Sequence, residues 1–301
     1  MKAIIPVAGY GTRLEPHTLI SQKCLLPVAG KPVLEHILDR LTESSVTEIT
    51  LIVGHLGAQV REFCSTYSKV EFTFVEQVEQ LGLGHAVYQG LDQSEEPVVI
   101  VLGDSILELD YNNLLSSKIS TFGVYKVPDP KRFGIVELDG DRIINVVEKP
   151  ENPPSNLALI GIYYISSQKK LVEGLEYLMN NDIRTKKEYQ LTDAFSIMIK
   201  RGHIFESLKI DTCMDCGVPE SMLSTNLKLL EMENNNAIHS SVIIEDSDLY
   251  HCTISENCIV KDSNLKNVIM LPGSKAINSQ LENRIIGFDE CFEGSTTVSD
   301  S

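Results

Sequence analysis

Lys2–Arg13, KAIIPVAGYGTR, is an apolar, β-prone run that passes directly into a turn with two glycines. Glycine has no Cβ atom, so such a turn can adopt positive φ and bring backbone N–H groups close to an anion. Arg13 and the later Lys23 supply cations, the first as a planar fork and the second as a point charge. The stretch therefore predicts a buried strand that ends in a phosphate-binding loop.

Two better-known phosphate loops do not fit this stretch. A dinucleotide fingerprint needs a third glycine where Leu14 stands, and a Walker loop needs Gly-Lys-Ser/Thr after a four-residue gap. The remaining alternative is a tight turn whose arginine faces solvent. Pro16, Lys23 and the Leu-Leu-Pro-Val run at residues 25–28 accompany Arg13 and favour the phosphate loop.

The stretch from Lys2 to Leu38 resembles the N-terminal signature of the sugar-1-phosphate nucleotidylyltransferases, which include glucose-1-phosphate thymidylyltransferases and uridylyltransferases. That signature is Gly-x-Gly-Thr-Arg-Leu-x-Pro-x-Thr, followed by Pro-Lys, Leu-Leu-Pro-Val and Lys-Pro. The chain departs from it at Gln22, where the family usually carries proline. It matches at Gly9, Gly11, Thr12, Arg13, Leu14, Pro16, Thr18, Lys23, Leu25, Leu26, Pro27, Val28, Lys31 and Pro32.

The resemblance implies transfer of a nucleotidyl group from dTTP or UTP to a sugar 1-phosphate, with release of pyrophosphate. Glucose 1-phosphate is the expected sugar substrate. The sequence does not decide between uridine and thymidine, because one 5-methyl and one 2′-hydroxyl group distinguish them and neither needs a charged partner.

Composition agrees with small-molecule substrates. The 301 residues carry a formal charge of −16, which argues against a nucleic acid or an anionic membrane as the main partner. No apolar run approaches the roughly 20 residues that span a bilayer, and the N-terminus lacks the features of a signal peptide. Seven cysteines, an odd number, fit a reducing compartment better than a disulfide framework, so we expect a cytoplasmic protein.

The sequence Cys213-Met214-Asp215-Cys216 contains a CxxC spacing. On a strand, Cys213 and Asp215 would share one face and Cys216 would point to the other. That arrangement is poor for zinc, and no second CxxC follows.

Strands and helices alternate through the first part of the chain. This order predicts an α/β fold: a Rossmann-like, mostly parallel sheet with helices on both faces and ligands at the carboxyl ends of the strands. The expected strands are Ile4–Ala8, Ile49–Val53, Val70–Val75 and Val98–Leu102, and the expected helices are Val33–Leu41, Gln59–Thr66 and Gly84–Gly90.

The middle of the chain completes a catalytic domain that we place at residues 1–235. Strands are expected at Ser120–Val127, Gly134–Leu138, Arg142–Glu148, Leu159–Ile165 and within Ile204–Met214, and helices at Lys169–Asn180, Leu191–Arg201 and Pro219–Asn234.

The C-terminal part has a different pattern. From Ala237 to Gly287 aliphatic residues recur at near-hexapeptide spacing among polar ones, which suits short strands stacked in a β-helix. A small β-sandwich could show the same alternation. We expect a short left-handed β-helix at 236–287, similar to the tail of many relatives, and a frayed tail at 288–301. Such β-helices commonly serve as assembly surfaces, so we also expect a homo-oligomer.

Two aspartates are candidate magnesium ligands. Asp104 follows the most apolar strand, and Asp215 ends a later one. Magnesium is usually held by one or two carboxylates together with substrate phosphates and water. A lone aspartate after a strand is otherwise a turn or helix cap. The resemblance identifies Leu102-Gly103-Asp104 and Asp215-x-Gly217 as the family's metal-binding positions, with departures at Ser105 and Cys216.

The resemblance also assigns the nucleotide site. Gln77 and Gly82 have the family spacing of a glutamine and a glycine that read the pyrimidine base. The backbone from Ala8 to Thr12, with Gly9 and Gly11, together with Arg13, is expected to bind the nucleotide. His85 is expected to be a packed helix residue rather than a catalytic base.

The sugar phosphate site is implied in the same way. Gly134 would make room for the pyranose, Glu148 would accept hydrogen bonds from sugar hydroxyls, and Lys149 would hold the phosphate. Gly161 would line the pocket, and Lys186 stands where relatives carry an arginine or lysine for the sugar phosphate. Without the resemblance, Glu148 and Lys149 would be read as a solvated surface pair.

The expected mechanism needs no protein nucleophile, because a sugar 1-phosphate is already a dianion above its second pKa of roughly 6. Arg13, Lys23, Asp104 and Mg²⁺ would act by positioning and electrostatics.

Three other functions remain open. They are a non-catalytic regulatory or assembly subunit, an added acyltransferase activity in the tail with His239 and His251, and a glycosyltransferase with Asp139-Gly140-Asp141 as its metal motif.

Overall fold

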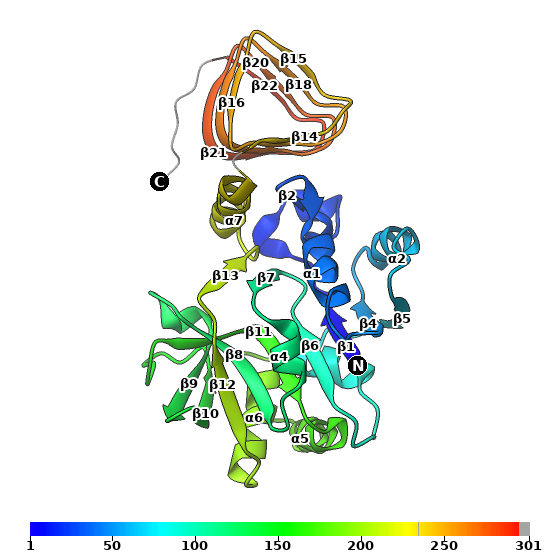
Figure 1. Cartoon of the computed structure of the whole chain (residues 1–301), viewed down its shortest axis with the longest axis vertical. Coiled ribbons are helices and arrows are strands. Elements are labelled where there is room, and N and C mark those ends of the chain that lie inside the picture. The colour runs from blue at the N-terminus through cyan, green and yellow to red at the C-terminus, as the bar shows by residue number, and fades with distance from the viewer. Residues whose placement is uncertain (234, 295–301) are drawn as a thin grey trace. The chain divides into compact units, whose positions relative to one another are not determined.

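Strand β1 (Lys2–Pro6) carries the apolar run that opens the sequence. In the computed structural model, which describes residues 1–233 and 235–294, β1 lies inside a nine-stranded sheet between β4 (Glu48–Val53) and β6 (Val98–Val101) (Figure 1). Both of these neighbours run parallel to β1. Side chains on both faces of β1 are buried, which explains its continuous apolar sequence.

The described residues form two compact units. The first consists of Met1–Gly9 and Leu38–Cys213, and the second of Tyr10–Ile37 and the chain from Met214 onward. Each is described by itself below. The limits at residues 235 and 287 that the sequence suggests remain predictions.

The sheet of the first unit is mixed. Its order is β5 (Glu71–Glu76), β4, β1, β6, β11 (Leu157–Ile165), β8 (Ser120–Lys126), β12 (Phe205–Lys209), β10 (Arg142–Glu148) and β9 (Gly134–Asp139). The first four strands are parallel, as expected. Beyond β6 the sheet departs from the expected mostly parallel order, because β11 runs antiparallel to both β6 and β8, although β12 runs parallel to β8. The chain reaches β11 from the hairpin β9–β10 rather than through a crossover helix.

Three of the helices pack on one face of this sheet and share an apolar core with it. The helices of the first unit are α2 (Gly57–Ser65), α3 (Leu83–Gly90), α4 (Tyr111–Leu115), α5 (Gln168–Asn180) and α6 (Leu191–Lys200), and α1 (Val33–Thr42) begins in the second unit. Residues of α3, α5 and α6 pack with alternate residues of β1, β6, β8 and β11. The sequence misses β7 (Ser105–Glu108), α4 and the short helix η4 (Pro130–Arg132).

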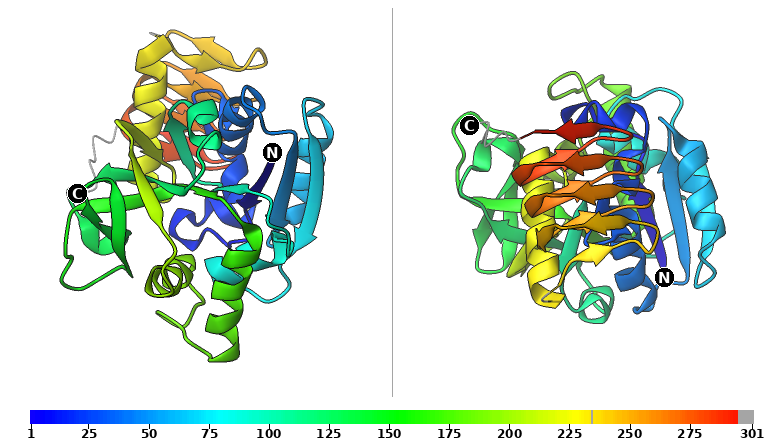
Figure 2. Two further views of the ribbon diagram at one scale, coloured as in Figure 1. Left: turned by 60° about the horizontal axis from the view of Figure 1, so that its bottom comes forward. Right: turned by 90° about the horizontal axis from the view of Figure 1, so that it is seen from above.

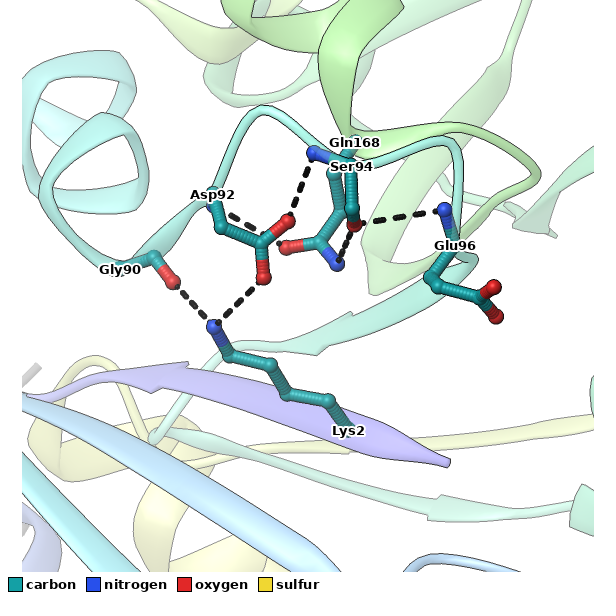
Figure 3. Close-up of polar contacts among 6 residues, drawn as sticks. All are labelled: Lys2, Gly90, Asp92, Ser94, Glu96 and Gln168. Carbon is teal, nitrogen blue, oxygen red and sulfur yellow. Dashed lines mark hydrogen bonds and ion pairs between the residues drawn. The ribbon is translucent and has the colours of Figure 1, made fainter.

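The loop between α3 and β6 holds the start of β1 and the start of α5 (Figure 3). Lys2 Nζ donates to Gly90 O at 2.8 Å and lies 3.7 Å from Asp92 Oδ2. Gln168, at the first turn of α5, accepts from Asp92 N and donates to Ser94 Oγ, both at 3.3 Å. The hydrogen bond from Ser94 is the main cause that lowers the pKa of Asp92.

The second unit begins with three short helical turns and a small hairpin. These are η1 (Thr12–Leu14), η2 (His17–Leu19), η3 (Lys23–Leu25), β2 (Pro27–Val28) and β3 (Lys31–Pro32). The unit continues from strand β13 (Thr212–Asp215) into α7 (Pro219–Glu233) and a series of short strands. These strands are β14 (Ala237–Ile238), β15 (Ile243–Glu245), β16 (Asp248–Tyr250), β17 (Thr253–Ile254), β18 (Ile259–Lys261), β19 (Asn264–Met270), β20 (Lys275–Ile277), β21 (Gln280–Ile286) and β22 (Cys291–Glu293).

The short strands stack in parallel (Figure 2). Ile243 pairs with Ile259, which pairs with Lys275, which in turn pairs with Cys291. Cys252, Ile254, Val260, Leu265 and Ile286 are among the aliphatic and thiol side chains that form the buried core of the stack.

Residues with a left-handed backbone conformation recur at equivalent positions of the stack, which explains why these positions are polar. His251, Asn267 and Asn283 all have φ near +50°, a conformation that short polar residues tolerate best. The Asn267 side-chain amide donates to Asn283 Oδ1 at 2.8 Å across 16 residues, so the repeat also forms a ladder of side-chain hydrogen bonds.

A fully buried asparagine joins the parts of the second unit. Asn226, on α7, accepts from Ala29 N at 3.0 Å and from Thr253 Oγ1 at 2.6 Å. Its amide nitrogen lies 3.4 Å from His251 O and from Asn267 Oδ1. These four contacts pair the side-chain oxygen and nitrogen of Asn226, which would be costly to leave without hydrogen bonds in a core.

Three expectations about the chain as a whole can be compared with the structure. Strand β22 lies inside the tail predicted to be frayed, and it is ordered because it pairs with β20 and Phe292 packs on the core. Residues 295–301 of that tail lie outside the described residues. None of the seven cysteines, all of them described, forms a disulfide bond. Among the described helices, none has the length and apolar character to cross a bilayer.

The aromatic core of the first unit provides a stability test. Phe122 is fully buried, with ring centroids 4.3 Å from Phe195 and 4.7 Å from Phe205. Phe122→Ala should lower the free energy of unfolding by about 3–5 kcal/mol, because it removes buried apolar area and leaves a cavity. Urea denaturation followed by circular dichroism measures the change. Ile144→Ala, at a half-exposed position, is the control, and equal midpoints for the two variants would contradict this packing.

Candidate functional site

The carboxyl end of β1 meets the carboxyl end of β6 at the switch point of strand order. A Cβ atom on Gly103 would clash with the Val7 side chain, so only glycine fits after β6. This close approach places the Gly103–Asp104 turn beside the end of β1. Asp104 is half-buried, and Ser105 Oγ donates to its Oδ1 at 3.3 Å. Ligands of α/β sheets bind at such switch points.

Ala8 connects this edge to the loop that follows β5. Its carbonyl oxygen accepts from Gln80 Nε2 at 2.8 Å and from His55 N at 3.2 Å. Gly9, the next residue, is exposed. The end of β1 is therefore held on two sides while Gly9 stays accessible.

Gln77 and Gly82 lie together, as the sequence predicts. Gln77 is 5% exposed, and its Nε2 donates to Gly82 O at 3.3 Å. The same nitrogen lies 3.1 Å from His85 Nδ1. Gly82 has φ of +113°, which favours glycine.

The loop that carries Lys186 is bonded to the loop of Gln77 and Gly82. Tyr189 N donates to Leu81 O, and Gly84 N donates to Tyr189 O, both at 2.8 Å. A Cβ atom on Gly82 would lie 2.8 Å from Tyr189 O, and one on Gly84 would lie equally close. The two glycines thus allow a backbone contact that joins a predicted base-reading loop to a predicted phosphate-binding loop.

Three residues that sequence reasoning missed hold the Lys186 loop in shape. Arg184 Nε donates to Asp182 Oδ1 at 2.6 Å, and Tyr189 OH donates to the same oxygen at 2.8 Å. These hydrogen bonds, with that of Tyr189 first, lower the pKa of Asp182. Lys186 and Lys187 both have positive φ inside the loop.

Glu148 is a structured, buried carboxylate rather than a solvated one. Its side chain is 8% exposed, and its Oε1 lies 2.9 Å from Lys149 Nζ. Its Oε2 accepts from Thr192 Oγ1, also at 2.9 Å. A Cβ atom on Gly134 would lie 3.2 Å from this oxygen and 2.7 Å from Thr192 Cγ2. Gly134, Glu148 and Lys149 therefore share one place in the fold.

Gly161 brings β11 close to the end of β6. It has φ of +84°, and a Cβ atom on it would lie 3.0 Å from the Leu102 side chain. Leu102 N donates to Gly161 O at 2.8 Å, two residues before Asp104. Gly161 is thus adjacent to the Asp104 turn.

Buried Tyr163 lies within the electrostatic influence of both Glu148 and Asp104. Burial raises the pKa of its phenol, and the negative charges of Glu148 and then Asp104 raise it further. The sequence gives no sign of this, because Glu148 ends β10, Tyr163 lies on β11 and Asp104 lies in the turn after β6.

In the second unit, Gly11 lies against Lys23. Gly11 has φ of +68°, and a Cβ atom on it would lie 3.1 Å from Lys23 Cβ and 2.9 Å from Thr18 Cγ2. Thr18 Oγ1 donates to Gly11 O at 3.0 Å. Gln22, which replaces the family's proline, caps η3 by accepting from Cys24 N at 2.6 Å. Thr12 and Arg13 lie on η1 and are exposed.

Asp215 also belongs to the second unit. It ends β13, and the absence of a Cβ atom at Gly217 leaves room for its carboxylate, whose Oδ1 would lie 2.9 Å from such an atom. No group of three or more His, Cys, Asp or Glu side chains within residues 1–233 and 235–294 could hold a metal. Asp104 and Asp215 belong to different units, and their role as magnesium ligands remains a prediction.

The chain has relatives of known type. A family model described as nucleotidyl transferase matches residues 2–232. The chain belongs to the nucleotidyl transferase family.

Asp139-Gly140-Asp141, the metal motif of the glycosyltransferase alternative, lies in the turn of the hairpin β9–β10, as the sequence predicts.

Three proteins illustrate the similarity. The bifunctional protein GlmU of Methanococcus maripaludis is 36% identical over 82% of this chain, and a glucose-1-phosphate thymidylyltransferase of Streptomyces antibioticus is 32% identical over 77%. The matches cover 61% and 67% of those proteins, so the chain spans less than two thirds of this GlmU. The solved UDP-glucose pyrophosphorylase of Acinetobacter baumanii has a TM-score of 0.64 at 26% identity, over 76% of this chain and 93% of that one.

The two glycines of the nucleotidyl transferase turn differ in a testable way. Apart from its two chain neighbours, no described residue has an atom within 4 Å of a Cβ atom placed on Gly9, whereas Gly11 is crowded and has positive φ. Gly11→Ala should therefore destabilise the fold by about 1–2 kcal/mol. Gly9→Ala should leave the melting temperature unchanged.

For nucleotide binding, the substitution that matters is the one at Gly9, which should leave the stability of the fold unchanged. If the Gly9 backbone approaches a phosphate, Gly9→Ala should raise the Kd for a nucleoside triphosphate about tenfold, the cost of one charge-assisted hydrogen bond. Calorimetric titration with UTP and dTTP measures this. Unchanged affinity in Gly9→Ala would remove Gly9 from the binding loop.

Proposed function

We propose that this nucleotidyl transferase family member transfers a nucleotidyl group from dTTP or UTP to a sugar 1-phosphate, with glucose 1-phosphate as the first candidate. One observation carries the proposal. The Gln77–Gly82 loop, suited to a base, is bonded through Tyr189 to the Lys186 loop, suited to a phosphate. A site that must hold a nucleotide and a sugar phosphate together needs such a connection.

The reaction follows from the charges of the substrates. The sugar phosphate oxygen attacks the α-phosphorus in line, a new P–O bond forms, and the bond to the β-phosphate breaks to release pyrophosphate. Arg13 and Lys23 would neutralise oxygens of the triphosphate, and Lys149 and Lys186 would hold the sugar phosphate. Glu148 would accept from sugar hydroxyls beside Gly134, with Gly161 lining the pocket. Orientation and electrostatic stabilisation then supply the rate acceleration.

Asp104 and Asp215 are the residues proposed to hold Mg²⁺. When bound, the ion would neutralise charge that develops on the phosphates. Asp215 ends β13 with space for its carboxylate at Gly217, and Asp104 lies in the turn between β6 and β7.

We also propose that residues 236–287 form a left-handed β-helix that follows a catalytic domain at 1–235 and serves in homo-oligomer assembly. Parallel pairing, with ladder bonds such as Ser263 N to Ser247 Oγ spanning 16 residues, supports coils of constant length. A β-sandwich would require antiparallel neighbours instead.

The second candidate is a regulatory or assembly subunit without activity. Such subunits tend to lose the charged set that this chain retains at Arg13, Lys23, Asp104 and Asp215. An acyltransferase activity in the repeat region has little support, because the exposed His239 pairs locally with Ser241 Oγ at 2.9 Å.

The deciding experiment is pyrophosphate release with Mg²⁺ over a panel of nucleoside triphosphates and sugar 1-phosphates. We expect turnover with UTP or dTTP and little with CTP, ATP or GTP. Lys23→Ala should lower kcat about 10²–10³-fold, the usual cost of losing a group that stabilises transition-state charge.

Lys69→Ala serves as the matched control, because Lys69 is an exposed lysine whose only recorded ion pair within the described chain is with Asp39, at 3.8 Å. It should retain the wild-type kcat. No turnover with any substrate pair would favour the regulatory subunit, and an unchanged kcat in Lys23→Ala would remove Lys23 from the reaction.

A further inference from the structure

The direction of the Gln77 side-chain amide is fixed by its neighbours. Gly82 O can only accept a hydrogen bond, so the group that faces it must be the NH₂ of Gln77. The same nitrogen lies 3.1 Å from His85 Nδ1. An amide nitrogen carries two hydrogens, and these two acceptors engage both of them.

The Gln77 carbonyl oxygen is left for a ligand. Within the described residues no hydrogen bond to Gln77 Oε1 occurs, and Asp193 Oδ2 is the single side-chain oxygen or nitrogen that is both buried and unpartnered. Gln77 Oε1 is therefore in contact with solvent although the residue as a whole is buried. An accessible acceptor on an otherwise buried, hydrogen-bonded amide is suited to recognition.

This arrangement requires a particular state of His85. Nδ1 can accept from Gln77 only when it carries no proton, so the ring must be neutral with its hydrogen on Nε2. Nε2 lies 3.2 Å from Gln89 Nε2, so this tautomer requires the Gln89 side-chain amide to be turned, with its oxygen toward the ring. Burial lowers the pKa of His85, whereas the charge of Glu79 and a hydrogen bond with the Glu79 backbone raise it. The neutral form therefore prevails at pH 7.

We infer that His85 is a positioning residue that sets the Gln77 amide to read the N3–H group of uracil or thymine. The inference rests on the proposed function and deepens it. Uracil and thymine carry a hydrogen on N3, which the Gln77 carbonyl oxygen accepts. The N3 atom of cytosine carries no hydrogen and can only accept. In the same position it would face Gln77 Oε1, which is also an acceptor, and the two would repel each other. A site built for one polar group rejects the analogue that lacks it.

Protonation of His85 should weaken this preference. An imidazolium donates from both nitrogens, so Gln77 can accept from it only by turning its oxygen toward His85 and its NH₂ toward the base, which gives up the hydrogen bond to Gly82 O. The NH₂ group cannot accept from the N3–H of uracil, but it can donate to N3 of cytosine. Because the pKa of His85 is lowered, the preference should be constant near pH 7 and above and should fall only as the pH drops through that lowered pKa.

The measurement is the ratio of kcat/KM for UTP to kcat/KM for CTP, taken between pH 5 and 8. The ionisation of the sugar phosphate affects both reactions equally and cancels in this ratio. His85→Phe keeps a ring but removes the acceptor, and it should lower the ratio at pH 7.5 at least about tenfold, the effect of one unmade hydrogen bond in a buried site. The loss should come mainly from a raised KM for UTP.

His85→Asn provides the rescue. Its amide oxygen occupies approximately the position of Nδ1 and accepts from Gln77 without titrating in this range. We expect a ratio close to that of the wild type and independent of pH. Tyr88→Phe is the matched control on the same helix, because it removes only the hydrogen bond from Tyr88 OH to Glu176 Oε1, and it should leave the ratio and its pH dependence unchanged.

The outcomes separate the inference from the function on which it rests. Turnover of UTP or dTTP with the same ratio and pH profile in all variants would overturn the role of His85 and leave the proposed function intact. No turnover of any nucleotide by the wild type would overturn the function itself. If His85→Phe fails to fold, the pH profiles of the wild type and His85→Asn still decide, because equal profiles contradict the inference.

Discussion

The two backbone hydrogen bonds of Tyr189, to Leu81 and Gly84, are the constraint on which the first unit's candidate site depends. They exist because Gly82 and Gly84 have no side chain where the Tyr189 backbone passes. On one side of this contact, Gln77 is held by Gly82 and His85. On the other side, Asp182, Arg184 and the Tyr189 hydroxyl group shape the loop of Lys186. The loops proposed to bind the nucleotide and the sugar phosphate are thereby joined through short backbone hydrogen bonds rather than through mobile side chains.

Much of the first unit could be predicted from the sequence. The strands β4 and β6 and the helices α3 and α5 lie within two residues of their predicted bounds, because periodicity and burial act locally. The antiparallel entry of β11 could not be predicted, since it depends on a hairpin that replaces a crossover helix. In the second unit, aliphatic spacing predicted the stacked strands, but the buried bonds of Asn226 depend on residues far apart in the sequence.

The candidate site shows the same division. Spacing and family resemblance placed Gln77 with Gly82, and Gly134 with Glu148, and the structure brings each pair together. The residues that position them were missed, because Arg184 acts through a loop of unusual backbone shape and His85 acts through a glutamine on another segment. His85 was expected to serve only in packing. It also contacts two side-chain amides and has a pKa lowered by burial, which are the observations behind the positioning role inferred for it.

The most direct test of this account is the affinity of Gly84→Ala for each substrate, measured by calorimetry. Its Cβ atom would lie 2.8 Å from Tyr189 O and would push the two loops apart. If the loops act as one body, affinity for the pyrimidine triphosphate and for glucose 1-phosphate should fall together. A loss confined to the triphosphate, with glucose 1-phosphate bound as in the wild type, would contradict the account.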